Sequence, residues 1–324
     1  MRRSVVDVGS NSVLLVVAEL QDGKWITLDE FSKVTGLGQG TKSTHLLSED
    51  AMIRTLAALA EAKERSNSFG VTEMVSGATM AARIATNAGE FLARADAQGT
   101  PVSIISGDLE AELGFLAVAN DPGFAGSERI SIVDPGGHST ELVTADRELH
   151  QVPGGISDSI TWNIRYRRSV PIGALGLRET HLTDESPGFA QRMSATKEID
   201  TQIGLEYRPH EHGTVVVLGA TGTNLISIRE KLTSWHPEKV HLATLDYEEI
   251  SRAAAWMLDM TDAERAAISG IEPGREKSLH IGCLILERFL FALRAEKCVV
   301  SVRGWRHALL ENPTLLSIAP VSAQ

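Results

Sequence analysis

The stretch VVDVGSNS at residues 5–12 is matched in pattern by IVDPGGHS at residues 132–139. Each run of β-branched residues ends in Asp-x-Gly and then small polar residues, which predicts a strand leading into a tight turn. Backbone N–H groups in such a turn can hold phosphate oxygens, while the carboxylate holds a metal ion or its water. A single Asp-x-Gly turn is more often an ordinary hairpin. Two in matching register, followed by LGATGTN at residues 218–224, favour three loops that converge on one cleft.

Strand-like and helix-like segments alternate around these turns. The runs SVVDV, SVLLVVAEL and WITLDEF predict an antiparallel meander, and a helix capped by Ser48 should follow. After residue 128 the order of strand, Asp-x-Gly turn and strand begins again, which indicates an internal duplication. The Gly- and Pro-rich stretch DPGFAGSE at residues 121–128 separates the two parts. We therefore expect one domain at residues 1–125 and a second at residues 126–324.

Composition limits the class of protein. The chain has 324 residues, of which 43% are hydrophobic, enough for two domains with cores. A net charge of -11 argues against a general basic surface for nucleic acid. Cys283 and Cys298 are too few for a zinc site or disulfide framework, and we interpret them as buried thiols in a reducing compartment. Asp7 and Asn11 interrupt any signal-peptide core, and no apolar run could span a membrane, so we expect a cytoplasmic location.

DVGSNSVLL at residues 7–15 resembles the first phosphate motif of the exopolyphosphatase and guanosine pentaphosphate phosphohydrolase family. Four further segments match motifs of that family in the same order: ATMAARIATNAGEFLARA, SGDLEAELGFLAV, VDPGGHSTELV and VSVRGWRHALL. The resemblance implies an α/β fold of duplicated actin- and sugar-kinase-like (ribonuclease H-like) domains that flank a central cleft. Longer members continue into extra helical domains, so the chain resembles the short, two-domain subclass.

The resemblance also implies catalytic residues. Hydrolysis of a phosphoanhydride needs an activated water and neutralised charge on the phosphate oxygens. Glu110, which matches the second Glu of the Glu-Glu-Ala motif, is the candidate general base. Arg83 matches the motif arginine and is the candidate phosphate-binding cation. The alternatives are a solvated glutamate in the first turn of a helix for Glu110 and a surface ion pair for Arg83.

The phosphate loops supply the remaining candidates. The acidic residues Asp7, Asp134 and Glu141 would hold Mg²⁺, or another divalent metal, directly or through waters. Single hydroxyl groups and glycines in these loops could equally serve only the turns. The candidate substrate-binding residues are Gly9, Ser10, Asn11, Ser12, Gly136, Gly137, His138, Ser139, Thr140, Gly219, Gly222 and Thr223.

Several positions depart from the family pattern. Leu109 and Glu112 stand where the family has a Glu and often an Arg, so one carboxylate is lost and one charge reversed. Pro135 removes a donor N–H from the second loop. His138 adds an imidazole that could bind phosphate, donate a proton or merely block the cleft, and we prefer a tolerated turn residue to a catalytic one. The arginines at positions 165, 167 and 168 form either a local cationic strip for a polyanion or, as we prefer, solvated charges on a helix.

Together these expectations predict a Mg²⁺-dependent exopolyphosphatase. Such an enzyme removes terminal phosphate from inorganic polyphosphate, and we expect it to prefer short chains. Guanosine pentaphosphate is the alternative substrate. A non-catalytic sensor of polyphosphate or an alarmone is a second alternative, and a kinase of the same superfold a third. No nucleic acid or membrane partner is expected, and a homodimer is left open.

Overall fold

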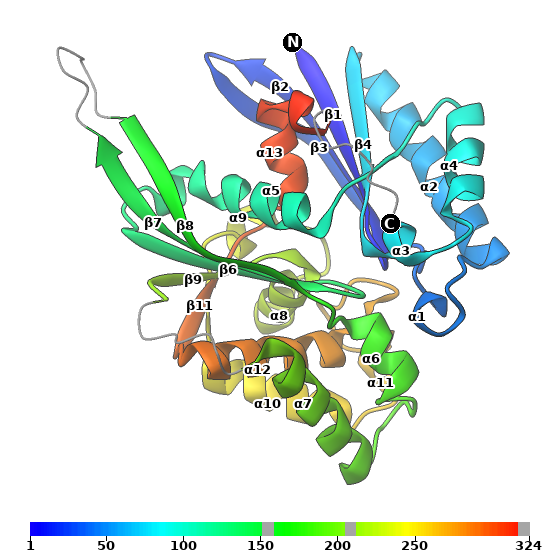
Figure 1. Cartoon of the computed structure of the whole chain (residues 1–324), viewed down its shortest axis with the longest axis vertical. Helices are drawn as coiled ribbons and strands as arrows, with labels where there is room; N and C mark the ends of the chain where they lie inside the picture. The colour runs from blue at the N-terminus through cyan, green and yellow to red at the C-terminus, as the bar shows by residue number, and fades with distance from the viewer. Residues whose placement is uncertain (151–158, 205–211, 317–324) are drawn as a thin grey trace.

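The computed structural model describes residues 1–150, 159–204 and 212–316 and contains two β-sheets with helices packed against them (Figure 1). The first sheet has the order β3-β2-β1-β4-β5 and the second the order β10-β11-β9-β6-β7-β8. The first-sheet strands are β1 (Arg2–Val8), β2 (Ser12–Gln21), β3 (Lys24–Val34), β4 (Glu73–Ala78) and β5 (Ser103–Ile104). The second-sheet strands are β6 (Arg129–Pro135), β7 (Thr140–His150), β8 (Ser159–Val170), β9 (Thr214–Val217), β10 (Thr244–Asp246) and β11 (Lys297–Val300).

The two sheets share one construction, as the sequence predicted. Strand β1 pairs antiparallel with β2 and parallel with β4, and β6 pairs antiparallel with β7 and parallel with β9. Parallel neighbours require a crossover connection, and helices supply it in both halves. Both β1 and β6 are almost fully buried, which explains their runs of Val and Ile. The duplicated α/β fold class is confirmed.

Helices cover the sheets and fill the space between them (Figure 1). In the first half they are α1 (Thr41–Thr44), α2 (Glu49–Ser68), α3 (Met80–Ile84), α4 (Ala88–Ala97), α5 (Gly107–Ala119) and the 3-10 helix η1 (Pro122–Phe124). In the second half they are α6 (Ala174–Thr180), α7 (Phe189–Ile203), α8 (Gly219–Arg229), α9 (Pro237–Val240), α10 (Tyr247–Leu258), α11 (Asp262–Ala266), η2 (Arg275–Lys277), α12 (Leu279–Leu293), α13 (Trp305–Glu311) and η3 (Pro313–Leu316). No helix within the described ranges combines the length and apolarity that a bilayer crossing requires.

Helix α5 is apolar on two opposite faces because it packs between the two sheets. Leu113 belongs to a core cluster with first-sheet residues. Phe115 belongs to a separate cluster with second-sheet residues, and its ring meets that of Trp162 edge-on at 5.5 Å between centroids. A helix that is apolar around most of its circumference is buried on most sides. Helix α5 therefore fixes the first turn, where Glu110 lies, at the junction of the two halves.

Helix α13 returns from the second half of the chain to the first sheet. Trp305 and Leu309, which are 3% and 0% exposed, pack in one cluster with Val5 and Val16. All strands of the first sheet precede residue 105 and all strands of the second follow residue 128. We propose the division into residues 1–125 and 126–324 on that basis, with helix α13 packed back across it.

Cys283 and Cys298 are buried free thiols, as predicted. Burial raises the pKa of the Cys298 thiol to about 12 and raises that of Cys283 as well. Both thiols therefore stay protonated and contribute as small apolar groups of the second core.

We expect Leu309→Ala to lower the free energy of unfolding by about 2–5 kcal/mol, because it opens a cavity under the first sheet. Ile53→Ala is the matched control, since Ile53 is 51% exposed on helix α2, and it should change stability by less than about 1 kcal/mol. Urea unfolding followed by circular dichroism measures both. Equal effects of the two substitutions would show that helix α13 adds little to the first core.

Candidate active site

The two Asp-x-Gly turns contain the same backbone hydrogen bond. In the first turn the Gly9 N–H donates to the carbonyl oxygen of Ser12 at 2.9 Å. In the second turn the Gly136 N–H donates to the carbonyl oxygen of Ser139, also at 2.9 Å. The two turns are thus equivalent in geometry as well as in sequence.

The strand registers on either side of the turns are equivalent too. Asp7 of β1 lies opposite Leu14 of β2, and Asp134 of β6 lies opposite Glu141 of β7. Each Asp is at the end of a central strand, where the backbone turns into the loop. The same position therefore carries an apolar side chain in the first hairpin and a second carboxylate in the second.

A cavity of about 730 Å³ lies between the turns and is lined by residues of both halves. Sites for small molecules commonly have this size, about 300–1,000 Å³. The predicted site residues that line it are Asp7, Gly9, Ser10, Asn11, Ser12, Glu110, Asp134, Gly136, Gly137, His138, Ser139, Glu141, Gly219 and Thr223.

Two predicted loop residues do not line the cavity. The Thr140 side chain is buried, and its hydroxyl donates to the carbonyl oxygen of Ile172 at 2.7 Å. Gly222 lies on the face of helix α8 that meets the sheet, where a Cβ would come within 2.7 Å of Val217. Thr140 thus connects β7 to the segment before helix α6, and Gly222 permits close packing of a helix on a strand.

Glu110 projects into the cavity from the first turn of helix α5 and is bound to Arg83. Nη1 of Arg83 lies 2.9 Å from Oε2 of Glu110, and the side chains are only 16% and 12% exposed. Arg83 reaches the cavity through Glu110, since it is not itself among the lining residues. Burial raises the pKa of Glu110, and the charge and hydrogen bond of Arg83 oppose that shift. The pair is therefore neither a solvated glutamate nor a surface ion pair.

Asp7, Asp134 and Glu141 are also buried, and the pKa of each is raised. Burial is the main cause for each, and the nearby charge of Glu110 adds to it in Asp7, Asp134 and Glu141. The pKa of Asp134 rises to about 7, and the pKa values of Asp7 and Glu141 rise well above their ordinary range. Oδ1 of Asp7 is buried with no hydrogen-bond partner among the described residues. The cavity thus gathers more carboxyl groups than its own cationic groups can keep ionised.

Comparison with known proteins identifies the family. The model of the Ppx/GppA phosphatase family matches residues 16–315. The chain belongs to the Ppx/GppA phosphatase family. Members of this family are phosphoanhydride hydrolases.

Individual Ppx/GppA relatives align over nearly the whole chain. Exopolyphosphatase 2 of Mycobacterium tuberculosis is 26% identical, over 97% of this chain and 98% of that protein. A crystal structure of the Aquifex aeolicus member of the Ppx/GppA family is 29% identical with a TM-score of 0.75, over 99% of both chains. A crystal structure of an exopolyphosphatase from Cytophaga hutchinsonii shares the fold, with a TM-score of 0.83 at 21% identity and full coverage of both chains.

Ppx/GppA phosphatases generally depend on a divalent metal, and two carboxylates of this cavity suit one. No three His, Cys, Asp or Glu side chains in the described segments are arranged as a metal cage. Mg²⁺ needs no such cage, because it is usually held by one or two carboxylates together with waters and substrate phosphates. Asp7, with its unpartnered oxygen, and Asp134 fit that role. Glu141 fits it less well, since its Oε1 accepts a hydrogen bond from Ser169 at 2.7 Å.

His138 of this Ppx/GppA member is buried between the two halves. It is 2% exposed, and neither ring nitrogen has a hydrogen-bond partner within the described part of the chain. Burial, with the nearby charge of Lys42, lowers its pKa to about 4, so the ring is neutral at pH 7. A Cβ on Gly38 would come within 2.8 Å of His138 Cε1 and within 2.9 Å of Ser10 Cβ. The imidazole thus occupies space between both phosphate loops and the segment after β3.

The arginines predicted as solvated charges on a helix instead lie on strand β8 and are bound to protein acceptors. Arg165 pairs with Asp146 at 2.6 Å, and Arg168 donates to the carbonyl oxygen of Ile203 at 2.9 Å. Arg167 pairs with Glu112 at 3.0 Å. The reversed charge at position 112 therefore has a partner outside the cavity, and none of these arginines lines it.

Several lining residues carry no motif that marks them in the sequence. Arg275 and Arg306 add positive charge, Glu30 adds a carboxylate, and Trp235 adds an aromatic ring. Glu30 lies in strand β3, Arg275 and Arg306 lie at or near the start of the short helices η2 and α13, and Trp235 lies in a connecting segment. No motif marked any of these four as a site residue. Arg306 does fall within the VSVRGWRHALL segment, which was the one available signal.

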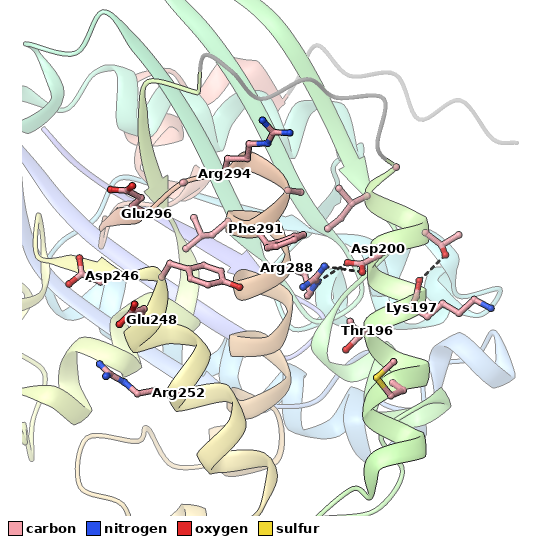
Figure 2. A pocket seen from close by; sticks show the side chains of 18 residues that line it. Thr196, Lys197, Asp200, Asp246, Glu248, Arg252, Arg288, Phe291, Arg294 and Glu296 are labelled. Carbon is pink, nitrogen blue, oxygen red and sulfur yellow. Dashed lines mark hydrogen bonds and ion pairs between the residues drawn. The ribbon is translucent and has the colours of Figure 1, made fainter.

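A second groove, between helices α7, α10 and α12, contains no predicted site residue (Figure 2). Its volume is about 1770 Å³. Figure 2 shows Arg288 of α12 reaching across to Asp200 of α7, and their ion pair measures 2.7 Å. The smaller cavity, which both phosphate loops line, is therefore the candidate site of the phosphatase chemistry.

We expect Gly173→Ala to disrupt the second phosphate loop, because a Cβ there would overlap the carbonyl carbon of Gly137 and the nitrogen of His138. Displacement of the loop should lower phosphatase activity by about 100-fold. Gly188→Ala is the matched control, since both glycines precede a helix in extended backbone and Gly188 has open space around its Cα. Phosphate release by both variants is the measurement. Normal activity in Gly173→Ala would mean that the loop adjusts without loss.

Proposed function

We propose that the protein is an exopolyphosphatase that removes terminal phosphate from inorganic polyphosphate with the help of Mg²⁺ or another divalent metal. The observation that carries this proposal is the pair of equivalent Asp-x-Gly turns that face one cavity beside the buried Arg83–Glu110 pair. Membership of a phosphatase family and the similarity to a protein named exopolyphosphatase 2 support it.

Glu110 is the proposed general base. Its carboxylate lines the cavity, and its burial raises the pKa above that of a free glutamate. A raised pKa strengthens the base, while Arg83 keeps the group ionised and in position. The base would take a proton from a water that attacks the terminal phosphorus and thereby separates it from the bridging oxygen.

The phosphate loops are the proposed substrate-binding groups. Turns of this type expose successive N–H groups to an anion. The hydroxyl of Ser12 is buried without a hydrogen-bond partner in the described ranges, so it remains available as a donor. The hydroxyl of Ser10 accepts a hydrogen bond from the Ala81 N–H at 3.1 Å and still has its own proton to donate. These groups would hold the terminal phosphate oxygens while the bond breaks.

Asp7 and Asp134 are the proposed metal ligands. A divalent cation bound there would neutralise charge on the phosphate oxygens. It would also offset the burial and the nearby charge of Glu110, which raise the pKa values of both carboxylates. The cavity is of small-molecule size, which favours short polyphosphate chains. The buried free thiols agree with a reducing compartment, and we propose the cytoplasm.

Glu110→Gln tests the hydrolytic role. Loss of the base should lower kcat by about 100- to 10,000-fold. Asp108→Asn is the matched control, because Asp108 is in the same helical turn but its side chain is 74% exposed. Phosphate release from tripolyphosphate with Mg²⁺ measures both variants, and a chelator should abolish the activity of the unmodified protein. Binding without any release by the unmodified protein would indicate a sensor instead.

Guanosine pentaphosphate is the second candidate substrate, because the cavity lining includes an aromatic ring and several apolar side chains. Trp235, Ile268, Ile271 and Pro273 line it together with the phosphate loops. An indole ring can stack on a purine base, and polyphosphate offers no group that needs such a surface.

Trp235→Ala should therefore raise KM for guanosine pentaphosphate about 5- to 100-fold, the range of one base–aromatic stack, and leave KM for tripolyphosphate unchanged. Trp256→Ala is the control, since Trp256 is 46% exposed and outside the cavity lining. Steady-state kinetics on the two substrates measures the effect. An unchanged KM for guanosine pentaphosphate would assign no base-binding role to Trp235.

A further inference from the structure

Arg306 lies in the first turn of helix α13 and lines the cavity together with Glu30 of strand β3. Nη2 of Arg306 is 3.1 Å from Oε1 of Glu30, and the two side chains are 12% and 14% exposed. Nε of Arg306 is buried and has no hydrogen-bond partner among the residues described. The guanidinium group is thus anchored at one nitrogen and has unused N–H groups.

His307 fixes the carboxylate that anchors Arg306. Its Nε2 lies 3.4 Å from Oε1 of Glu30, and its Nδ1 accepts a hydrogen bond from the Gly304 N–H at 3.1 Å. Nδ1 also lies 3.3 Å from the carbonyl oxygen of Gly304. We assign the ring proton to Nε2, because an unprotonated Nε2 would face the Glu30 carboxylate as a second acceptor. Burial alone would raise the pKa of Glu30, but His307 and Arg306 lower it to about 2, so the carboxylate is ionised at pH 7.

Arg306 lines the same cavity as both phosphate loops. Burial dominates the pKa values of Asp7 and Asp134, yet the charge of Arg306 lowers both, although the two residues come from opposite halves. A cation that acts on both must lie near both. The guanidinium of Arg83, by contrast, is bound to Glu110 and is not itself part of the lining.

We propose that Arg306 binds a non-bridging oxygen of the anionic substrate and that Glu30 and His307 hold its guanidinium group in position. This assignment rests on the phosphate-binding role proposed for the cavity. In this role, Arg306 is a cation that is already oriented for phosphate binding before the substrate enters the acidic cavity. A guanidinium fork is well suited to this task, because it presents several N–H donors to phosphate oxygens at fixed angles.

Calorimetric titration of tripolyphosphate with Mg²⁺ tests the proposal in a Glu110→Gln background, where the ligand is not consumed. Arg306→Ala should weaken the affinity about 10- to 100-fold, the range for a lost hydrogen bond to a charged group. Arg303→Ala is the matched control and should bind normally, since Arg303 pairs with Glu311 outside the cavity. Guanosine pentaphosphate is the second probe, because it presents the same phosphate oxygens.

Two further variants separate substrate binding from folding. Arg306→Lys keeps the charge and should recover part of the affinity, and guanidinium ions at low concentration should partly rescue Arg306→Ala. In the active enzyme, Glu30→Gln should raise KM more than it lowers kcat, as expected for a positioning residue.

Weakened binding upholds the proposal even if the unmodified protein releases no phosphate, a result that would count only against the hydrolytic function. Equal affinities in the Arg306→Ala and Arg303→Ala proteins would overturn the role of Arg306. Failure of both probes to bind with Arg306 intact would overturn it as well.

Discussion

Burial of like charges is the constraint on which this site depends. Asp7, Glu110, Asp134 and Glu141 line one cavity, and burial penalises the charged form of each. Such a cluster stays ionised at neutral pH only if cations are supplied nearby, because carboxylates without a partner bind protons instead. The protein supplies Arg83 to Glu110, and our proposals assign the remaining compensation to a divalent metal and to Arg306. The acidic cavity can therefore accept a polyanion because its cations are placed individually, even though the chain as a whole is acidic.

The same constraint explains the position of helix α5. Glu110 reaches the cavity because the helix is packed between the two sheets, with Leu113 in one core cluster and Phe115 in another. Arg83 also belongs to the first half, and Asp134 belongs to the second. The site is complete only when both halves are in contact. Packing of an apolar helix thus determines the distance between the proposed base and the second phosphate loop.

The sequence predicted the fold and much of the cavity lining because both depend on local patterns. Two strands that end in Asp-x-Gly specify two turns, and their equivalent hydrogen bonds are a direct consequence. It did not predict that Thr140 would bind Ile172 or that Gly222 would face Val217, because neighbours distant in sequence decide those contacts. Arg306, Glu30 and Trp235 were missed for the same reason, since the fold brings together residues up to 276 positions apart in the Arg306–Glu30 pair.

Helix α13 also determines when the core of the first sheet can form during synthesis on the ribosome. The core around Val5 and Val16 includes Trp305, Leu309 and Leu310. The apolar surface of the first strands is therefore covered only after residues 305–310 have been synthesised. A nascent chain that has only its first sheet exposes this surface, which is where chaperone binding or aggregation would begin.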